Sequence, residues 1–321
     1  MSWQEVRWRA EYLAFRLVAV VIDVLNVRQT KKLAEGMAWL LVYGLPRKWT
    51  RFHVAYANLE TAFGDRRSPE ELENIVYGMW VHLFRLVAEV IQFPRKVRLE
   101  NCRDVITFRS RDQAVKAIGT GRPVFFLGGH FGNWEATTVT FGVFGFLMGI
   151  VARKLDNPYL HQWFVEARER TGHQLLLKHG GVDGMSDILD VGGNLGLLCD
   201  QDAGRRGVFV DFFGKPASTF RSIALLAREY DALLVVGYGI RLPDDFCERR
   251  WAGFEIGCEE VIDPREIEAD DEVREITQRY TAALQRVIER HPEQYFWVHR
   301  RWKTDPKTRR KVREADIHRA A

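Results

Sequence analysis

The chain has 321 residues, of which 46% are hydrophobic and 28% are charged. This composition excludes disordered and low-complexity proteins, and the length predicts either two domains or one large α/β domain with an appendage. Four widely separated cysteines without a CxxC pair disfavour a zinc site or a disulfide framework. The formal net charge of +4 favours contact with anionic surfaces but identifies no partner.

The first part of the chain contains two apolar runs, and no signal peptide is evident. Arg16 and Asp23 interrupt the run 12–27, and Pro46 ends the run 36–45. Because spanning a bilayer needs about 18 or more apolar residues with few charges, buried amphipathic helices or an interfacial anchor are favoured over a spanning helix. Tryptophan and basic residues suited to an interface accompany the runs: Trp3, Trp8, Trp39, Arg7, Arg9, Arg28, Lys31 and Lys32.

A capped helix is predicted to begin after Ser68. Ser68 and Glu71 have the spacing of a capping box, and Pro69 suits the first helical position. Apolar residues then recur with a helical period as far as Pro94. The predicted organisation is a helical N-terminal region (1–100), an α/β domain (101–304) and a basic tail (305–321).

From about residue 104, short apolar runs alternate with helical stretches. The runs lack polar alternation, so their strands are expected to be buried on both faces by crossover helices. This pattern predicts an α/β fold with a central, largely parallel sheet flanked by helices. We expect strands at 105–108, 123–129, 147–153, 174–177, 195–200, 233–240, 251–256 and 295–299, and helices at 112–119, 133–145, 157–172, 218–230 and 270–291.

The segment 128–135, GGHFGNWE, carries the clearest chemical signal. His130 stands between a buried strand and a helix, where ligands bind in open α/β sheets. Five residues on one helix would separate His130 and Glu135 by about 140°, so they meet only if His130 precedes the helix and folds back. Glu135 would then fix the tautomer of His130, which could take a proton from a substrate hydroxyl. The alternative is a capping His130 and a solvated Glu135, and Asn133 is a further candidate substrate contact.

Two other strands are predicted to end in polar residues. Arg153 follows the run 147–152, and Asp200 and Gln201 follow the run 195–199. Parallel strands would therefore deliver a base, a cation and an acid–amide pair to one sheet edge. Arg153 could bind a phosphate or an anionic head group. Asp200 could hold either Arg153 or His130 in place, or it could be an ordinary carboxylate that caps a loop.

Apolar and basic segments accompany these residues. The apolar stretches 137–151 and 207–214 could be core or could line a groove for an acyl chain. Hydroxyl activation beside an apolar groove points to acyl transfer. The basic C-terminal end, which includes 299–303, could be a solvated tail or could contact phosphate or anionic lipid. Nucleic acid is disfavoured because no recognition motif accompanies the basic residues.

Three segments resemble a known family. HFGNWE (130–135), DQDAGRRGVFVDFFGKPAST (200–219) and QYFWVHRRWK (294–303) resemble the late acyltransferases of lipid A biosynthesis, a family that includes mycobacterial phosphatidylinositol mannoside acyltransferases. The resemblance covers roughly residues 30–304. It implies a glycerolphosphate acyltransferase-like fold and an enzyme on the cytoplasmic face of the inner membrane. Such an enzyme moves a fatty acyl group from an acyl carrier protein or coenzyme A thioester to a glycolipid hydroxyl.

The resemblance also implies roles for single residues. The family's His-x4-Asp/Glu motif falls on His130 and Glu135, and its Asp-Gln pair falls on Asp200 and Gln201. Its arginine before Asp-Asn-Pro falls on Arg153. No cofactor, metal or nucleic acid is implied. The family's N-terminal membrane helix is weakened here by charged residues, so interfacial anchoring is expected.

Three rival interpretations are weaker. A serine-type lipid hydrolase would need a nucleophile elbow, and the sequence contains none. A metal-dependent hydrolase that uses His130, Glu135 and Asp200 would lack the usual close ligand spacing, such as HExxH. A non-catalytic protein that binds the membrane surface would leave the polar residues at the strand ends unexplained.

Overall fold

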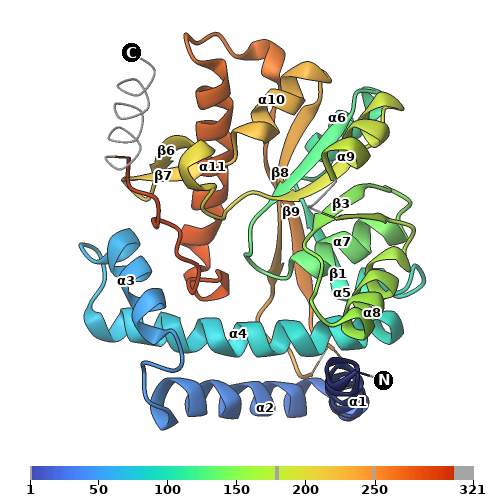
Figure 1. Cartoon of the computed structure of the whole chain (residues 1–321), viewed down its shortest axis with the longest axis vertical. Coiled ribbons are helices and arrows are strands. Elements are labelled where there is room, and N and C mark those ends of the chain that lie inside the picture. The colour runs from blue at the N-terminus through green and yellow to red at the C-terminus, as the bar shows by residue number, and fades with distance from the viewer. Residues whose placement is uncertain (1, 178–180, 248, 250, 307–321) are drawn as a thin grey trace.

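The N-terminal region is helical, as the sequence predicts. The computed structural model describes residues 2–177, 181–247, 249 and 251–306, so most of the expected basic tail lies outside the described residues. The first helices are α1 (Trp3–Val24), α2 (Val27–Trp39), α3 (Phe52–Phe63) and α4 (Pro69–Lys96). Helices α2 and α4 lie side by side beneath the rest of the molecule (Figure 1).

The predicted cap of α4 is confirmed. The Ser68 backbone N–H donates to Glu71 Oε2 at 2.7 Å, and the Glu71 backbone N–H donates to Ser68 Oγ at 3.3 Å. Among the described residues, α4 is also the one helix long and apolar enough to cross a membrane, but 44% of its most apolar window is buried inside the protein. Because α4 also carries the buried ionisable residues His82, Arg85 and Glu89, it packs here as a core helix.

The predicted α/β fold with a largely parallel sheet is confirmed. The sheet order is β1-β9-β8-β2-β5-β3-β4. Neighbours pair in parallel except β8 and β9, which are antiparallel. The strands are β1 (Ile106–Arg109), β2 (Val124–Gly128), β3 (Gly149–Ala152), β4 (Gln174–Leu177), β5 (Leu195–Leu198), β8 (Leu233–Arg241) and β9 (Phe254–Ile262).

Helices flank this sheet, and a small hairpin lies beside it (Figure 1). The helices are α5 (Cys102–Val105), α6 (Arg111–Gly119), α7 (Trp134–Val143), α8 (Pro158–Glu169), α9 (Gly181–Asp190), α10 (Arg221–Glu229) and α11 (Glu272–Arg290). The hairpin consists of β6 (Val208–Phe212) and β7 (Lys215–Thr219), which pair antiparallel. One apolar cluster joins α3 and α4 to the sheet and α11. The predicted division at residue 100 stays a prediction.

Some sequence-based predictions of elements are wrong. Residues 295–299 form turns and one isolated bridge, Tyr295 to Phe131, in place of the expected strand. The aromatic side chains there are buried by packing on one another, with the Tyr295 and Trp297 ring centroids 4.8 Å apart. The helix expected from residue 218 begins only at Arg221 because Thr219 still pairs in β7. The hairpin β6–β7 and helix α9 were not expected.

A buried ion pair joins α4 to the sheet. The Arg241 guanidinium donates through Nε and Nη2 to the two carboxylate oxygens of Glu89, each at 2.6 Å. Both side chains are almost fully buried. Removing one partner of such a pair leaves an uncompensated buried charge.

We therefore expect Arg241→Met to lower the free energy of unfolding by about 3–5 kcal/mol. Arg228, which pairs with Glu272 on the surface at 2.7 Å, provides the control, and Arg228→Met should cost at most about 1 kcal/mol. Chemical denaturation of the two variants measures both values. Equal losses would show that the buried pair contributes no more than the surface pair.

Candidate active site

His130 lies in the short loop between β2 and α7. Asn133 caps α7, its Oδ1 accepting a hydrogen bond from the Ala136 backbone N–H at 2.9 Å. The loop turns at Gly132, which has a positive φ of 57°. A Cβ atom there would lie 2.1 Å from the Gly239 carbonyl oxygen. Only glycine fits this turn, which presents His130 beyond the carboxyl end of β2.

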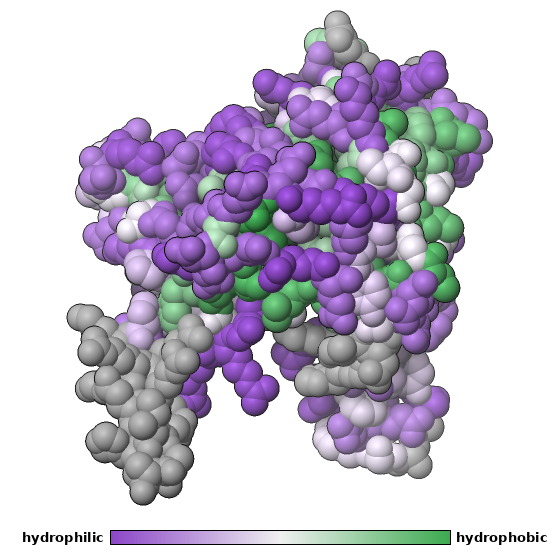
Figure 2. Space-filling model, turned by 90° about the horizontal axis from the view of Figure 1, so that it is seen from above, coloured by the Kyte–Doolittle hydropathy of each residue, from purple (hydrophilic) through white to green (hydrophobic). Residues whose placement is uncertain are grey.

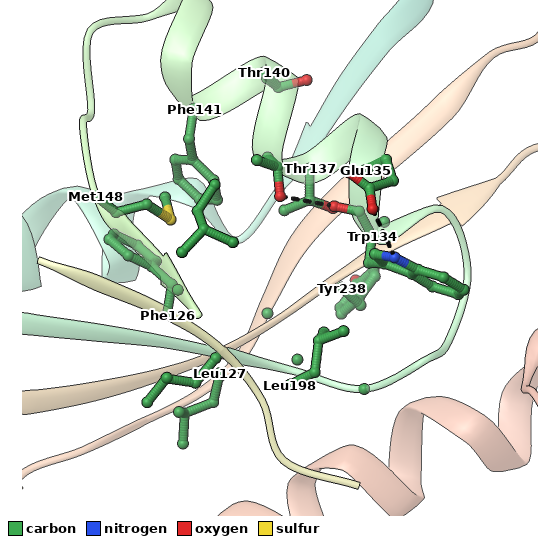
Figure 3. Close-up of a pocket in the computed structure, with 18 of the residues that line it drawn as sticks. Phe126, Leu127, Trp134, Glu135, Thr137, Thr140, Phe141, Met148, Leu198 and Tyr238 are labelled. Carbon is green, nitrogen blue, oxygen red and sulfur yellow. Dashed lines mark hydrogen bonds between the residues drawn. The ribbon is translucent and has the colours of Figure 1, made fainter. Parts of the chain in front are cut away.

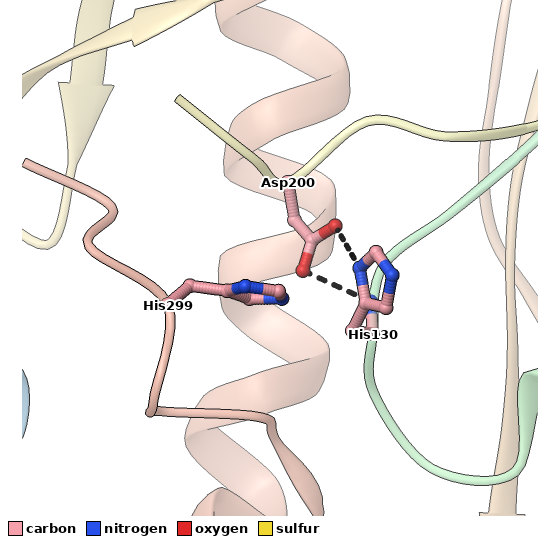
Figure 4. A group of neighbouring side chains, drawn as sticks. All are labelled: His130, Asp200 and His299. Carbon is pink, nitrogen blue, oxygen red and sulfur yellow. Dashed lines mark hydrogen bonds and ion pairs between the residues drawn. The ribbon is translucent and has the colours of Figure 1, made fainter. Parts of the chain in front are cut away.

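Asp200 holds the His130 ring (Figure 4). The Asp200 Oδ1 atom lies 2.8 Å from His130 Nδ1, and Oδ2 accepts the His130 backbone N–H at 2.9 Å. The Asp200 side chain is fully buried, whereas the His130 side chain keeps 20% of its surface exposed. An N–H on Nδ1 that donates to the carboxylate leaves Nε2 as the basic nitrogen. Asp200 thus holds His130 in place, which is one of the roles that the sequence leaves open for it.

His130 and Asp200 each stabilise the charged form of the other. Burial lowers the pKa of His130, but the Asp200 charge and hydrogen bond outweigh burial and raise that pKa above its usual 6.5. Burial alone would raise the pKa of Asp200, yet the neighbouring His130 holds it well below its ordinary range. His130 is therefore poised to gain a proton, while Asp200 stays ionised.

Glu135 is not the hydrogen-bonding partner that the sequence predicts for His130. Its Oε1 atom accepts from Arg168 Nη2 at 2.6 Å, and its Oε2 atom accepts from Arg168 Nε at 3.2 Å. Trp134 Nε1 also donates to Oε1 at 3.1 Å. Glu135 lies in the first turn of α7, where its side chain meets α8, and Asp200 already occupies Nδ1 of His130. Its charge still acts on His130 and contributes to the raised pKa.

Asn133 does not fit its expected contact with substrate. Its side chain is fully buried, and its Nδ2 atom donates to Glu89 at 2.7 Å. Both ends of the amide are therefore used inside the protein. His82 supports the same loop: burial lowers its pKa well below 6.5, and its neutral ring lies 3.0 Å from the Gly132 carbonyl oxygen through Nε2.

The remaining strand-end residues meet at one edge of the sheet. Strands β2, β5 and β3 are neighbours in that order, so their carboxyl ends place His130, Asp200 and Arg153 along the same edge. Arg153 and Gln201 line one cavity together with His130 and Glu135. This convergence agrees with the sequence-based expectation, and the functions of Arg153 and Gln201 stay predictions.

The cavity is large and mostly apolar (Figure 3). Its volume is about 1390 Å³, which exceeds the roughly 300–1,000 Å³ of typical small-molecule sites. Side chains from the stretch 137–151 contribute to its wall, as an acyl groove would require. The stretch 207–214 instead belongs to the hairpin β6–β7, and its buried Phe212 and Phe213 join the core. Residues drawn in the close-up of the wall include Phe126, Leu127, Thr137, Phe141, Met148 and Leu198.

His299 also lies at the site, although it is not among the site residues predicted from the sequence. Its ring centroid lies 4.8 Å from that of His130. The donor atoms of His130, Asp200 and His299 all lie within 4.8 Å of one another, and in the described ranges no other group of this kind could hold a metal ion. The short hydrogen bond between Asp200 and His130 accounts for their contact without a metal. The one available signal for His299 was its position in the third segment of family resemblance.

Arg301 also differs from the expected solvated tail. It is 2% exposed, and it donates to the Ser218 carbonyl oxygen and to Thr219 Oγ1, each at 2.6 Å. At least this member of the basic C-terminal segment is therefore a core residue that fixes the segment against β7.

Together, the fold and the site define an α/β protein whose His–Asp pair faces an apolar cavity, an arrangement suited to activating a hydroxyl group beside a lipid chain. Residues 5–304 match the model of the bacterial lipid A biosynthesis acyltransferases. The chain belongs to this family and is therefore an acyltransferase.

Individual relatives agree with the family. The chain is 26% identical over 306 residues to the lipid A biosynthesis lauroyltransferase of Escherichia coli K12, covering 85% of this chain and 91% of the relative. It is 31% identical over 163 residues to the phosphatidylinositol mannoside acyltransferase of Mycolicibacterium smegmatis, about half of each chain. The crystal structure of the 1-acyl-sn-glycerophosphate acyltransferase PlsC from Thermotoga maritima aligns with a TM-score of 0.38 at 11% identity, over 83% of this chain and 99% of that chain.

Proposed function

We propose that the protein transfers a fatty acyl group from a thioester, carried by acyl carrier protein or coenzyme A, to a hydroxyl group of a glycolipid similar to a lipid A precursor. The observation that carries this proposal is the hydrogen bond between Asp200 and His130, which lines the apolar cavity. His130 is the general base, and Asp200 orients it. The family membership supports acyl transfer to a glycolipid.

The proposed reaction uses both nitrogens of His130. Nδ1–H stays bonded to Asp200, and Nε2 takes the proton of the acceptor hydroxyl as its oxygen attacks the thioester carbonyl. The tetrahedral intermediate collapses as the C–S bond breaks, and the imidazolium returns the proton to the thiolate. The new bond is an ester, and His130 ends in its starting state. This is the histidine–carboxylate half of a serine-protease triad, with the nucleophile supplied by the substrate.

We assign the remaining polar groups of the cavity to substrate contact. Arg153 is exposed at the end of β3 and lines the cavity, so its guanidinium suits a phosphate or another anionic group of a substrate. Gln201 follows Asp200 directly and lines the same cavity. Its amide is a candidate donor for the oxyanion that forms on the thioester carbonyl.

Glu135 and Arg168 act as one unit in this proposal, because their side chains are paired through two hydrogen bonds on the cavity wall. We expect Glu135→Gln and Arg168→Met each to lower kcat/KM, and the double variant to be about as impaired as the worse single variant. Steady-state kinetics of the three variants test this expectation. Effects that multiply in the double variant would show that the two residues act independently.

The N-terminal helices suit a peripheral site on the inner membrane, at its cytoplasmic face. Most exposed large apolar side chains of the described chain lie in the first 50 residues. On α1, the exposed fractions are 82% for Trp3, 71% for Leu17 and 74% for Val24. The surface seen from the end opposite α2 and α4 is mainly hydrophilic, with smaller apolar areas (Figure 2). Phe15 of α1 lines the cavity, so the same helix carries exposed apolar side chains and part of the cavity wall.

An acyl-transfer assay tests the proposed function. The protein is incubated with a lipid extract and either an acyl–acyl carrier protein or an acyl–coenzyme A. The molecular masses of the lipids are then measured by mass spectrometry. We expect a glycolipid to gain the mass of one acyl group with at least one donor. The His130→Ala variant is the control for contaminating activity. Release of free fatty acid without acylated glycolipid would instead identify a thioester hydrolase.

A further inference from the structure

The C-terminal segment 294–301 is fixed to three separate elements. The Gln294 side chain exchanges two hydrogen bonds with the backbone of Arg241 at the end of β8, at 2.9 and 3.0 Å. Asn58 of α3 donates to the carbonyl oxygens of Trp297 and His299. Arg301 is bound to β7, as described above. These anchors give the segment a defined position without strand pairing.

The same segment runs beside the His130 loop. The Gly132 backbone N–H donates to the Gln294 carbonyl oxygen, and the Phe296 backbone N–H donates to the His130 carbonyl oxygen, each at 2.9 Å. Between these two bonds lies the bridge of Phe131 to Tyr295. The backbone on both sides of Phe131, including the carbonyl group of His130, is therefore tied to the backbone on both sides of Tyr295.

This arrangement buries two polar side chains of the segment. The Tyr295 hydroxyl and the His299 Nε2 atom are buried and make no hydrogen bond of ordinary geometry within the described chain. The side-chain ligand atoms of Asp200, His130 and His299 all lie within 4.8 Å of one another, and the backbone of Tyr295 is bridged to Phe131, next to His130. Burial, followed by the Asp200 charge, raises the pKa of Tyr295 well above its usual value. A carboxylate has about four acceptor sites, and His130 uses only two of those on Asp200.

We propose that Tyr295 and His299 are positioning residues that hold the Asp200 carboxylate together with His130. This inference rests on the proposed function, in which His130 is the base. Neither residue touches the reacting atoms in this account; both act through Asp200. In Figure 4 the His299 ring and the His130 ring lie on different sides of the Asp200 carboxylate.

Both positioning groups are neutral at neutral pH. Burial lowers the pKa of His299 to about 4, against the opposing effect of Asp200, and Tyr295 keeps its proton. The other charged or titratable groups near the site are Glu135 and Arg168 beside His130, and Cys199, Arg51 and Arg301 beside Tyr295 or His299. Neutral donors can orient Asp200 without competing with the imidazolium for its charge.

Two conservative variants test the proposal. Tyr295→Phe removes one hydroxyl and keeps the ring that packs on Trp297. His299→Leu removes both ring nitrogens, and His299→Gln restores a hydrogen-bond donor. We expect Tyr295→Phe and His299→Leu to lower kcat by about 10- to 100-fold with KM for the glycolipid nearly unchanged, and His299→Gln to recover part of the loss.

The pH profile separates positioning from a general structural role. Without the Tyr295 donor, the Asp200 carboxylate stabilises the His130 imidazolium more strongly, so the pKa of His130 rises. The acid limb of the pH profile of kcat/KM should therefore move upward by about half a pH unit in Tyr295→Phe. Tyr230→Phe and His291→Gln are matched controls, because both residues are partly exposed and neither lines the cavity. Neither control should change kcat or the profile.

Two results would overturn the proposal. One is wild-type kcat and acid limb in both Tyr295→Phe and His299→Leu. The other is a lower kcat with an unshifted acid limb and no recovery in His299→Gln, which would indicate a structural role alone. If His130→Ala itself keeps its activity in the same assay, the proposed function fails; if only the Tyr295 and His299 variants match wild type, the failure is confined to this inference.

Discussion

Replacing His130 with alanine should lower kcat/KM for acyl transfer at least about 100-fold, the lower end for loss of a general base. The variant keeps the loop, because the backbone N–H of residue 130 still donates to Asp200 and Gly132 still makes the turn. Transfer of a labelled acyl group to glycolipid measures the effect.

The matched control for this prediction is His53→Ala. His53 is an exposed residue of α3, and its removal should leave kcat/KM unchanged. Near-normal turnover by His130→Ala, with fold and substrate unchanged, would end the proposal that this residue is the base.

Asp200→Asn should lower kcat by about 10²- to 10⁴-fold. The amide has nearly the same shape, but it removes the charge that stabilises the imidazolium and can hold the wrong tautomer of His130. Because Asp200 raises the pKa of His130 above 6.5, the wild-type kcat/KM should fall as the pH drops through that raised value. In Asp200→Asn, nothing from residue 200 offsets the lowering effect of burial on the pKa of His130. The acid limb of the pH profile of kcat/KM, where activity falls as His130 gains a proton, should therefore move to lower pH.

Glu135→Gln provides the comparison for Asp200→Asn. Glu135 acts on His130 through its charge alone, whereas Asp200 acts through both charge and hydrogen bond. The acid limb should therefore move less in Glu135→Gln than in Asp200→Asn. A larger shift in Glu135→Gln, together with an unshifted Asp200→Asn, would restore Glu135 as the orienting residue.

The sequence predicts much of the site because strand ends are easy to locate. Buried apolar runs end just before His130, Arg153 and Asp200, and the parallel sheet turns these three ends toward one edge. The pairing of His130 was harder to predict, because spacing along the chain suggests only nearby partners such as Glu135. Asp200 is 70 residues away, and it reaches His130 because β5 lies next to β2.

Other sequence-based predictions also differ from the structure because contacts between residues distant in the chain decide the outcome. Asn133 looked available because it stands in a polar-rich motif, but the capped start of α7 and the buried Glu89 use its amide. The run 295–299 has the composition of a strand, yet the hydrogen bonds that place it come from the His130 loop and from Asn58. The contribution of His299 depends on that long-range packing, which no local pattern encodes.

Nitrogen NMR of histidine-labelled protein tests the central claim most directly, with His130→Ala used to assign the signals. We expect neutral His130 to carry its proton on Nδ1 and to have a pKa above 6.5, and we expect Asp200→Asn to lower this pKa. A neutral ring protonated on Nε2, or a pKa that does not respond to Asp200→Asn, would contradict this claim.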